Sequence, residues 1–357
     1  MKVKMKVKRL RAPRLLTLGM GGGEDLVTLG TDFSGMGGGE ACFAKLSVNY
    51  ALIFSCDNSS ACEKLLKHKY KPKVFFPDIL LRKPEEEQYV DAYVWAAPCQ
   101  PYSSAGKQQG SADARGGPMM DAAVGFIRRQ RPRLTVMENV KGFANKKFRP
   151  VLNKLVADLK SFGYIVKVAL LNTKSYGVPQ DRKRIYLVAI RRDSAHRVFH
   201  WPKPLGDPLP MDHFLDPATP TDKAGRLPTA DAAKKLVKQA YAKAWKKGVN
   251  PLEVPVFVDV DCSQRFSVSG IGEAKTITRG RGATGGPWVS TRGRRTTIRE
   301  LFRLQGYNPS DFRWKAAGVS KPQMGAMIGN AMSLTVAAPV IAEGLWAAGL
   351  VSVKPSL

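Results

Sequence analysis

Cysteine is scarce in this chain of 357 residues, and none of it occurs in close pairs. The five cysteines are odd in number and form no CxxC spacing. This pattern argues against a disulfide framework and against a structural metal site, zinc included. A reducing intracellular compartment fits the composition. That compartment would be the nucleus in a eukaryote and the cytoplasm or nucleoid in a bacterium.

Long apolar runs are missing as well. No stretch approaches the roughly eighteen residues that a membrane-spanning helix needs, so we expect no membrane partner. The opening segment MKVKMKVKRLRAPR is basic and lacks the apolar core of a secretion signal. We expect residues 1–24 to form a basic arm without fixed structure, which is either a solvated tail, a contact for phosphate or a nuclear signal.

Acidic residues are the third deficit. Asp and Glu number 29 against 57 Lys and Arg, which leaves a formal net charge of +28. A field of this sign attracts polyanions, so nucleic acid is the predicted partner. A ribosome-associated chain, or one with basic tails, would share the charge, and the charge alone does not separate these interpretations.

Apolar runs and amphipathic segments alternate along residues 26–190. Strands are expected over 26–33, 50–56, 92–97, 134–139, 165–172 and 184–190, and helices over 41–46, 61–68, 120–130 and 148–163. The last helix ends at Gly163, the residue type that favours a helix C-terminus. The alternation predicts an α/β fold with a doubly wound, mostly parallel sheet. Ligands of such sheets bind beyond the carboxyl ends of the strands.

The amino-acid composition changes after Arg192, where a proline-rich stretch is followed by a basic helical segment over residues 230–248. In that helix Leu236, Ala240 and Trp245 are expected to face inward and the lysines outward. We therefore divide the chain into a catalytic domain over 25–193, a smaller domain over 194–293, and a segment over 294–357 that packs back on the first domain.

One cysteine stands at a position suited to chemistry. Cys99 lies in PCQPYSSAG, directly after the apolar run AYVWAA, and the end of a strand can present a partly exposed thiolate. On its own this pattern also fits a small buried residue. Four further motifs accompany it in order along the chain, namely FSGMGGG at 33–39 before it, and MENV at 137–140, QDRKRIY at 180–186 and GNAM at 329–332 after it.

This ordered set closely resembles the cytosine-5 DNA methyltransferase family, from about residue 28 to residue 345. The resemblance implies a Rossmann-like class I methyltransferase fold with a small target-recognition domain. It also implies transfer of a methyl group from S-adenosylmethionine to carbon 5 of a cytosine flipped out of double-stranded DNA. Cys99 would attack carbon 6, and Glu138 would engage ring nitrogen 3. Arg182 and Arg184, two apart on one strand, would contact the cytosine carbonyl and the region of the thiolate.

The resemblance also implies a cofactor site. FSGMGGG matches the S-adenosylmethionine loop, Asp57 the position that accepts from ribose hydroxyls, and Asp78 the acceptor for the adenine amine. The full expected set is Phe33, Gly35, Gly37, Asp57, Asp78, Ile79, Pro98 and Asn330. A nicotinamide dinucleotide is disfavoured, because the loop lacks G-x-G-x-x-G spacing.

Four residues depart from the family pattern. The chain has Thr31-Asp32-Phe33 where the family usually has Asp-Leu-Phe, Asp57 where Glu is usual, and Asn58 where a larger apolar residue is usual. The shorter Asp57 and the lost apolar area at Asn58 are expected to leave cofactor binding intact or somewhat weakened.

Contacts with DNA are expected from two places, with the protein acting as a monomer. Gln100 and Ser103 follow Cys99 in a segment resembling the loop that closes over a flipped base. Arg279 and Arg281 belong to a cluster with Arg292, Arg294 and Arg295, and a lysine-rich helix precedes them, so both groups suit phosphate. Two alternatives remain open. One is a tRNA cytosine-5 methyltransferase, whose Cys-Phe-Thr signature is not found here, and the other is a catalytically silent DNA-binding scaffold.

Overall fold

A seven-stranded sheet forms the centre of the protein. The computed structural model describes residues 26–97, 117–264 and 268–356. The strand order is β3-β2-β1-β4-β5-β8-β6, and β8 runs antiparallel to both of its neighbours while the other neighbouring pairs are parallel. The strands are β1 (Val27–Asp32), β2 (Tyr50–Cys56), β3 (Val74–Phe76), β4 (Ala92–Trp95), β5 (Leu134–Val140), β6 (Tyr164–Asn172) and β8 (Lys183–Arg191). The predicted doubly wound, mostly parallel sheet is confirmed, and β3 is a short edge strand that the sequence pattern did not predict.

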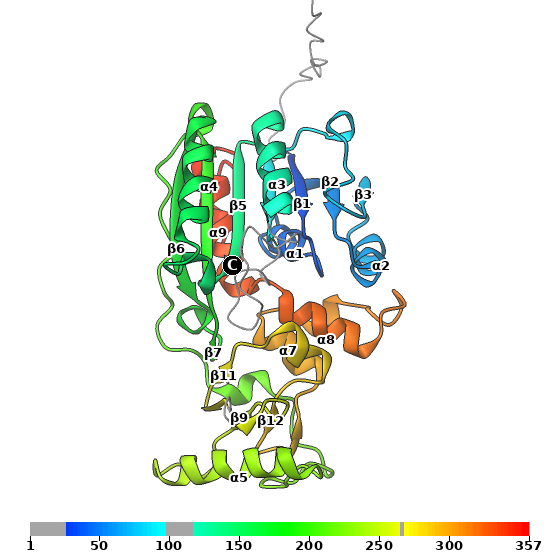
Figure 1. Ribbon diagram of the computed structural model, residues 1–357, viewed down its shortest axis with the longest axis vertical. Coiled ribbons are helices and arrows are strands. Elements are labelled where there is room, and N and C mark those ends of the chain that lie inside the picture. The colour runs from blue at the N-terminus through cyan, green and yellow to red at the C-terminus, as the bar shows by residue number, and fades with distance from the viewer. Residues whose placement is uncertain (1–25, 98–116, 265–267, 357) are drawn as a thin grey trace, which may run out of the picture.

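Helices cover both faces of this sheet (Figure 1). The apolar core on one face includes side chains of α1 (Gly38–Lys45), α2 (Ser60–Lys69) and α9 (Leu334–Ala347). The core on the other face includes α3 (Gly117–Gln130) and α4 (Arg149–Ser161). Strands buried from both sides need apolar residues in unbroken runs, which explains runs such as that of β4. Gly163 has a φ of 88° just after α4, as expected for a helix end.

A second, smaller unit lies at the end of the molecule where α5 (Asp231–Trp245) is drawn in Figure 1. Its sheet has the order β10-β9-β12-β13, formed by β9 (Val256–Val258), β10 (Ser269–Ile271), β12 (Trp288–Val289) and β13 (Arg294–Arg295). α5 packs on this sheet through a small core that contains Leu236 and Ala240. The expectation that Trp245 faces inward was wrong. Trp245 lies outside the buried face of α5, whose last member is Ala244, and it is 53% exposed.

Strand pairing and helix packing connect the large sheet with the smaller unit. Parallel pairing of β7 (Gln180–Asp181) with β11 (Ala274–Lys275) joins the chain after β6 to the smaller unit. α6 (Arg279–Ala283) crosses α8 (Lys321–Asn330) so closely that a Cβ on Gly282 would lie 1.9 Å from the carbonyl oxygen of Gly325. α7 (Ile298–Leu304) begins with a capping box between Thr297 and Glu300.

Short 3-10 helices complete the described chain at Pro84–Glu86, Lys141–Ala144, Thr173–Tyr176, Arg192–Ser194, Met211–Phe214 and Pro309–Asp311. Within the described ranges, no single helix has the length and apolar composition to cross a membrane, whereas α8 and α9 together, bent by 49°, meet that test by length and composition.

Candidate active site

A small pocket lies at the carboxyl ends of β1, β2 and β3. The structure brings four of the expected cofactor residues together in its lining, and Cys56, Asn58 and Met119 complete it. The four are Phe33, Asp57, Asp78 and Ile79. Sequence reasoning did not select Cys56 or Met119 for this site. Cys56 ends the apolar run of β2, and Met119 comes from α3, with no motif to mark it; its thioether adds apolar surface beside Asn58.

The loop between β1 and α1 has an unusual backbone. Phe33 and Gly35 have φ values of 55° and 57°, in the left-handed region. A Cβ added at Gly35 would meet nothing within 4 Å, so the loop leaves open space at this point. At Gly37, with a φ of 87°, a Cβ would lie 2.2 Å from the ring of Tyr70. Gly35 therefore suits close approach of a ligand, whereas Gly37 is required by packing inside the protein.

Two carboxylates organise the pocket. Asp57 accepts the backbone N–H of Gly35 at 2.8 Å through Oδ2 and that of Ser59 at 3.0 Å through Oδ1. Asp78 accepts the N–H of Leu80 at 2.9 Å through Oδ1. Each carboxylate oxygen keeps a second lone pair, so both side chains can accept further hydrogen bonds. Acceptors of this kind, with Phe33 and Ile79 as apolar surface, fit the ribose hydroxyls and adenine amine of S-adenosylmethionine.

A third carboxylate lies beneath the loop. Glu40 in α1 is fully buried and accepts hydrogen bonds from the hydroxyls of Thr31 and Ser55, both at 2.7 Å. Burial raises the pKa of Glu40. Its other oxygen, Oε2, has no hydrogen-bond partner among the described residues. The family usually has Asp at the position of Thr31. In this chain the carboxyl group next to that position comes instead from Glu40 of α1.

Glu138 and Arg184 form an ion pair between neighbouring strands. Arg184 Nε lies 3.1 Å from Glu138 Oε1, and Glu138 is only 6% exposed. The antiparallel register of β5 and β8 places Arg184 opposite Val140, so the two side chains meet at the end of β5. Burial raises the pKa of Glu138, although the charges of Arg184 and Arg182 act to lower it. A carboxyl group with this shift retains its proton to higher pH than an exposed one.

Arg182 occupies a different setting from Arg184. It lies between β7 and β8 and is 1% exposed. Its Nη1 donates to the carbonyls of Ile277 and Gly329, at 2.9 and 3.2 Å, and its Nη2 donates to that of Ala331 at 2.7 Å. These bonds hold the chain on both sides of Asn330. Asn330 itself is exposed at the end of α8 and does not line the pocket.

The expected nucleophile and its neighbours, Pro98, Cys99, Gln100 and Ser103, lie outside the described residues. The chain leading to them is placed by one contact. Asn139 Nδ2, next to Glu138, donates to the carbonyl oxygen of Ala97 at 3.4 Å. The last described residue before Cys99 is therefore joined to the strand that carries Glu138.

The arginines of the smaller unit are mostly engaged within the protein. Arg281 Nε lies 2.6 Å from Asp259, and Arg295 pairs with Asp261 at 2.5 Å. Arg294 binds Asp222 at 2.9 Å and the buried Glu300 at 3.0 Å, and Arg292 reaches Asp212 at 3.4 Å. The expectation that this cluster is available as a whole for phosphate is corrected, because these four charges are compensated. Arg279 is exposed, and roles for Arg279 and Arg281 toward DNA stay predictions.

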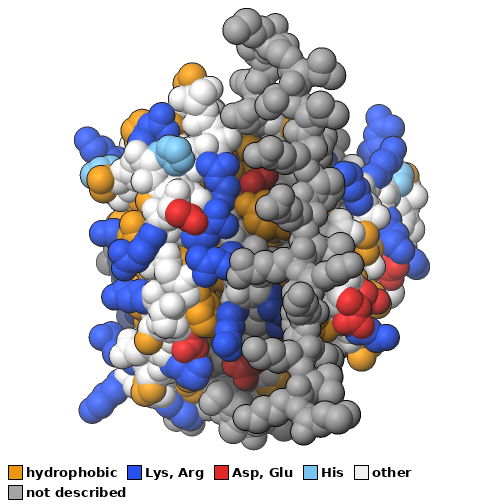
Figure 2. Space-filling view, turned by 90° about the horizontal axis from the view of Figure 1, so that it is seen from above, with side chains coloured by type: hydrophobic (Ala, Val, Ile, Leu, Met, Phe, Trp, Pro, Cys, Tyr) orange, Lys and Arg blue, Asp and Glu red, His pale blue; other side chains and the backbone are white. Residues whose placement is uncertain are grey.

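Uncompensated positive charge lies elsewhere. On α5 the side chains of Lys235, Lys238 and Lys243 are exposed, while Lys234 pairs with Asp231 at 3.0 Å. On the face seen in Figure 2, Lys and Arg side chains are spread widely and acidic side chains form small groups. The positive field therefore extends over more of the surface than α5 alone.

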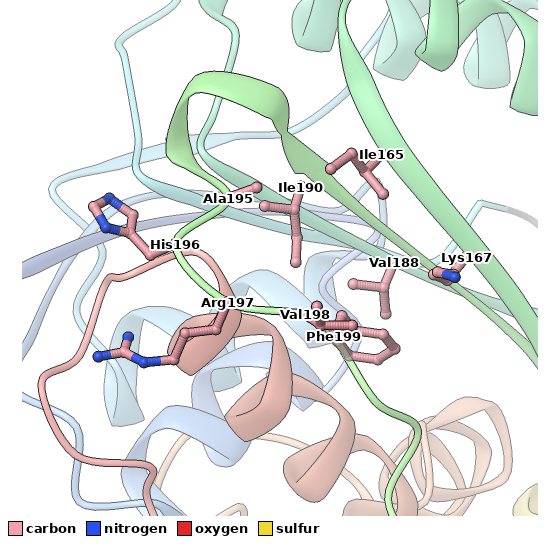
Figure 3. A pocket seen from close by; sticks show the side chains of 9 residues that line it. All are labelled: Ile165, Lys167, Val188, Ile190, Ala195, His196, Arg197, Val198 and Phe199. Carbon is pink, nitrogen blue, oxygen red and sulfur yellow. The ribbon is translucent and has the colours of Figure 1, made fainter.

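An apolar cavity of about 360 Å³ is remote from these motifs in the fold. It lies against β6 and β8, where the side chains of Ile165, Val188 and Ile190 face it together with Val198 and Phe199 (Figure 3). Arg197 turns away and donates to the carbonyl of Trp346 at 3.0 Å. None of the expected cofactor or catalytic residues lines this cavity, so it is not the candidate active site.

Known proteins are similar to this chain in sequence, and solved structures are similar to it in fold. The chain is 34% identical over 223 residues to the Type II methyltransferase M.MthTI of Methanothermobacter thermautotrophicus, covering 62% of this chain and 61% of the relative. It is 31% identical over 227 residues to the Type II methyltransferase M.HpaII of Haemophilus parainfluenzae, covering 60% and 61%. The chain thus matches about three fifths of the length of these relatives.

Among solved structures, the S. pombe Dnmt2 methyltransferase superposes with a TM-score of 0.63 at 15% identity, over 90% of this chain and 98% of that one. The Entamoeba histolytica methyltransferase EhMeth also gives a TM-score of 0.63, at 16% identity and with the same coverage. These likenesses show the fold. The family model of C-5 cytosine-specific DNA methylases matches residues 32–345. With motifs, fold and family model in agreement, the chain belongs to the C-5 cytosine-specific DNA methylase family.

Proposed function

We propose that this protein transfers a methyl group to carbon 5 of cytosine in double-stranded DNA. The observation that carries the proposal is the Glu138–Arg184 ion pair at the end of β5, next to the Asn139–Ala97 hydrogen bond. In the sequence, Cys99 follows Ala97 by two residues. The carboxyl group of Glu138 and the guanidinium of Arg184 therefore lie next to the point from which the chain continues toward Cys99, the proposed nucleophile.

These residues divide the reaction into two steps. The Cys99 thiolate adds to carbon 6 of the cytosine, and Glu138 donates a proton to ring nitrogen 3. Electron density then accumulates at carbon 5, where S-adenosylmethionine, when bound, supplies the methyl group. A water molecule then takes the carbon 5 proton as the Cys99 thiolate leaves carbon 6, and the proton on ring nitrogen 3 returns to Glu138, which restores the neutral ring. Arg184 offsets negative charge on the base and orients Glu138.

The remaining expected residues take supporting roles. Asp57, Asp78, Phe33 and Ile79 hold the adenosine part of the cofactor, and Gly35 permits its close approach. The resemblance adds Gly37, Pro98 and Asn330 to this set; Gly37 shapes the loop by its packing against Tyr70, and Asn330 lies outside the pocket lining. Arg182 keeps Asn330 in place and adds positive charge near Glu138. We assign target recognition to the unit over 194–293, with phosphate contacts from the exposed lysines of α5 and from Arg279. Arg281 is assigned a phosphate contact that requires its ion pair with Asp259 to open. Gln100 and Ser103 are assigned to the flipped-base loop, and the enzyme to a monomeric state.

The deciding experiment follows tritium from labelled S-adenosylmethionine into duplex DNA and, in parallel, into tRNA. We expect label in DNA, lost in Cys99→Ala, while that variant binds cofactor as the wild type does. Cys262→Ala is the matched control, because Cys262 is a free thiol outside the pocket and should be dispensable. Label in tRNA alone would contradict the proposed substrate, and full activity of Cys99→Ala would contradict the covalent mechanism.

A further inference from the structure

A buried ion pair joins the end of β1 to the loop that follows β3, and both segments lead to residues that line the pocket. Arg82 donates through Nη1 and Nη2 to the two carboxylate oxygens of Asp32, both at 2.8 Å. The two side chains are 1% and 0% exposed. The hydroxyl of Tyr93 also donates to Asp32. This planar, bidentate arrangement fixes orientation as well as distance, which a single point charge such as lysine cannot do.

Aromatic rings enclose the guanidinium. Its central carbon lies 4.9 Å from the ring centre of Phe54, 5.3 Å from that of Phe76 and 5.0 Å from that of Phe126. Replacing a buried ion pair by well-packed apolar residues is often neutral or stabilising. An apolar residue at position 32, as the family usually has, would suit this setting. The stability of the fold therefore does not by itself explain why the chain has Asp32 and Arg82 here.

The position of the pair along the chain supplies an explanation. Asp32 directly precedes Phe33, and Arg82 follows Ile79 by three residues; Phe33, Asp78 and Ile79 all line the pocket. The loop over residues 77–83 follows the short edge strand β3, which pairs with only β2 in the sheet. The bidentate bond attaches this loop directly to the end of the central strand β1.

We propose that Asp32 and Arg82 are positioning residues for the cofactor pocket, which set the separation between Phe33 and the Asp78–Ile79 segment and thereby the affinity for the adenosine part of the cofactor. This inference rests on the proposed function. It assigns a role to the departure from the family pattern at Thr31-Asp32-Phe33. Neither residue touches the reacting atoms, so the effect should appear in cofactor binding and not in the chemical step.

The test measures binding of S-adenosylhomocysteine and S-adenosylmethionine by titration calorimetry. The double variant Asp32→Leu/Arg82→Leu leaves no unpaired buried charge, so it should keep its fold. We expect its Kd for both ligands to rise about tenfold, its KM for S-adenosylmethionine to rise in parallel, and kcat at saturating cofactor to stay within about twofold. Arg82→Lys keeps the charge but loses the bidentate bond, and its Kd should lie between those of the wild type and the double variant.

Arg129→Gln is the matched control. Arg129 pairs with Glu87 at 2.6 Å, and Glu87 lies 3.9 Å from Arg82 Nε, so the substitution perturbs the same network without touching Asp32. Its Kd should equal that of the wild type. A wild-type Kd in the folded double variant would overturn the inference, and so would a wild-type Kd in Arg82→Lys if the double variant failed to fold. Failure of the wild-type protein to bind either ligand would contradict the proposed cofactor instead.

Discussion

The arginines of the smaller unit and Arg82 of the large domain differ in role, and in each case the role differs from what the sequence suggests. The basic cluster of the smaller unit resembles a phosphate-binding surface, yet Arg281, Arg294 and Arg295 pair with acidic side chains. Arg82, in the loop that follows β3 of the large sheet, lies in a stretch of sequence without a motif but is buried beside the proposed cofactor pocket. Local density of charge is therefore a poor guide to which charges are available to a ligand. Pairing across the fold decides it.

The difference extends to the lysines of α5. Lys235 and Lys238 are exposed on a helix whose opposite side packs on β9, so no acidic residue needs to approach them. Arg294, in contrast, lies beside the buried carboxylate of Glu300, which the capping box of α7 brings close. The smaller unit thus separates structural arginines from solvent-facing lysines. Substitutions in each of these two groups test this division, and substitutions in the large sheet test the roles of its buried charged residues.

The largest effect is expected at Glu138 in the large sheet. Glu138→Gln keeps the shape but cannot deliver a proton to ring nitrogen 3, and general acid catalysis is typically worth about 10²–10⁴ in rate. Single-turnover methylation should fall by that factor while calorimetry shows unchanged cofactor affinity. In the wild type, the rate should decline as pH rises through the raised pKa of Glu138, because the protonated form is lost. A rate equal to that of the wild type in Glu138→Gln would make Glu138 a structural residue only.

A second effect is expected at Arg294. Arg294→Met leaves the buried Glu300 without its guanidinium partner, and a buried group left unsatisfied costs about 1–3 kcal/mol or more when it is charged. Urea denaturation should show the destabilisation, whereas the dependence of DNA binding on salt should not change. A flatter salt dependence in this variant would mean that Arg294 contacts phosphate after all.

How far the sequence predicts this structure depends on the range of the interactions involved. The other strands and helices around the pocket follow from periodicity within each segment, and the ends of β1 and β2 bring Phe33 and Asp57 together as parallel strands require. The edge strand β3, which precedes Asp78, was not predicted, because three residues are too few to show a period. The place of Met119 in the pocket and the bond of Arg82 to Asp32 could not be predicted, because no motif marks them and each brings together segments that are far apart in the sequence; Arg82 and Asp32 are 50 residues apart. The role of Cys99 stays a prediction from its motif.

A third effect should appear in the lysines of α5. Replacing Lys235, Lys238 and Lys243 by Gln should reduce the slope of log K against log salt by about 0.9 for each phosphate that the helix no longer neutralises. Because these side chains are exposed, the free energy of unfolding should change by no more than about 0.5 kcal/mol. The methylated sequence should stay the same, which bisulfite sequencing checks. A changed sequence preference would assign α5 to base recognition.

The smallest effect concerns Glu40, the buried carboxyl group beneath the cofactor loop. Its pKa in the folded protein is raised above the ordinary value of 4.5, so the stability that the protonated group contributes is fully present below that pH and is lost as pH rises through the folded pKa. Glu40→Gln lacks this titration. The unfolding free energy of the wild type relative to the variant should therefore be highest below pH 4.5 and decline toward neutral pH. The decline should be about 1.4 kcal/mol for each tenfold difference between the acid constant of Glu40 in the folded protein and that in the unfolded protein. Urea denaturation across this pH range measures the difference, and parallel curves would show that Glu40 is ionised in the folded protein at its ordinary pKa.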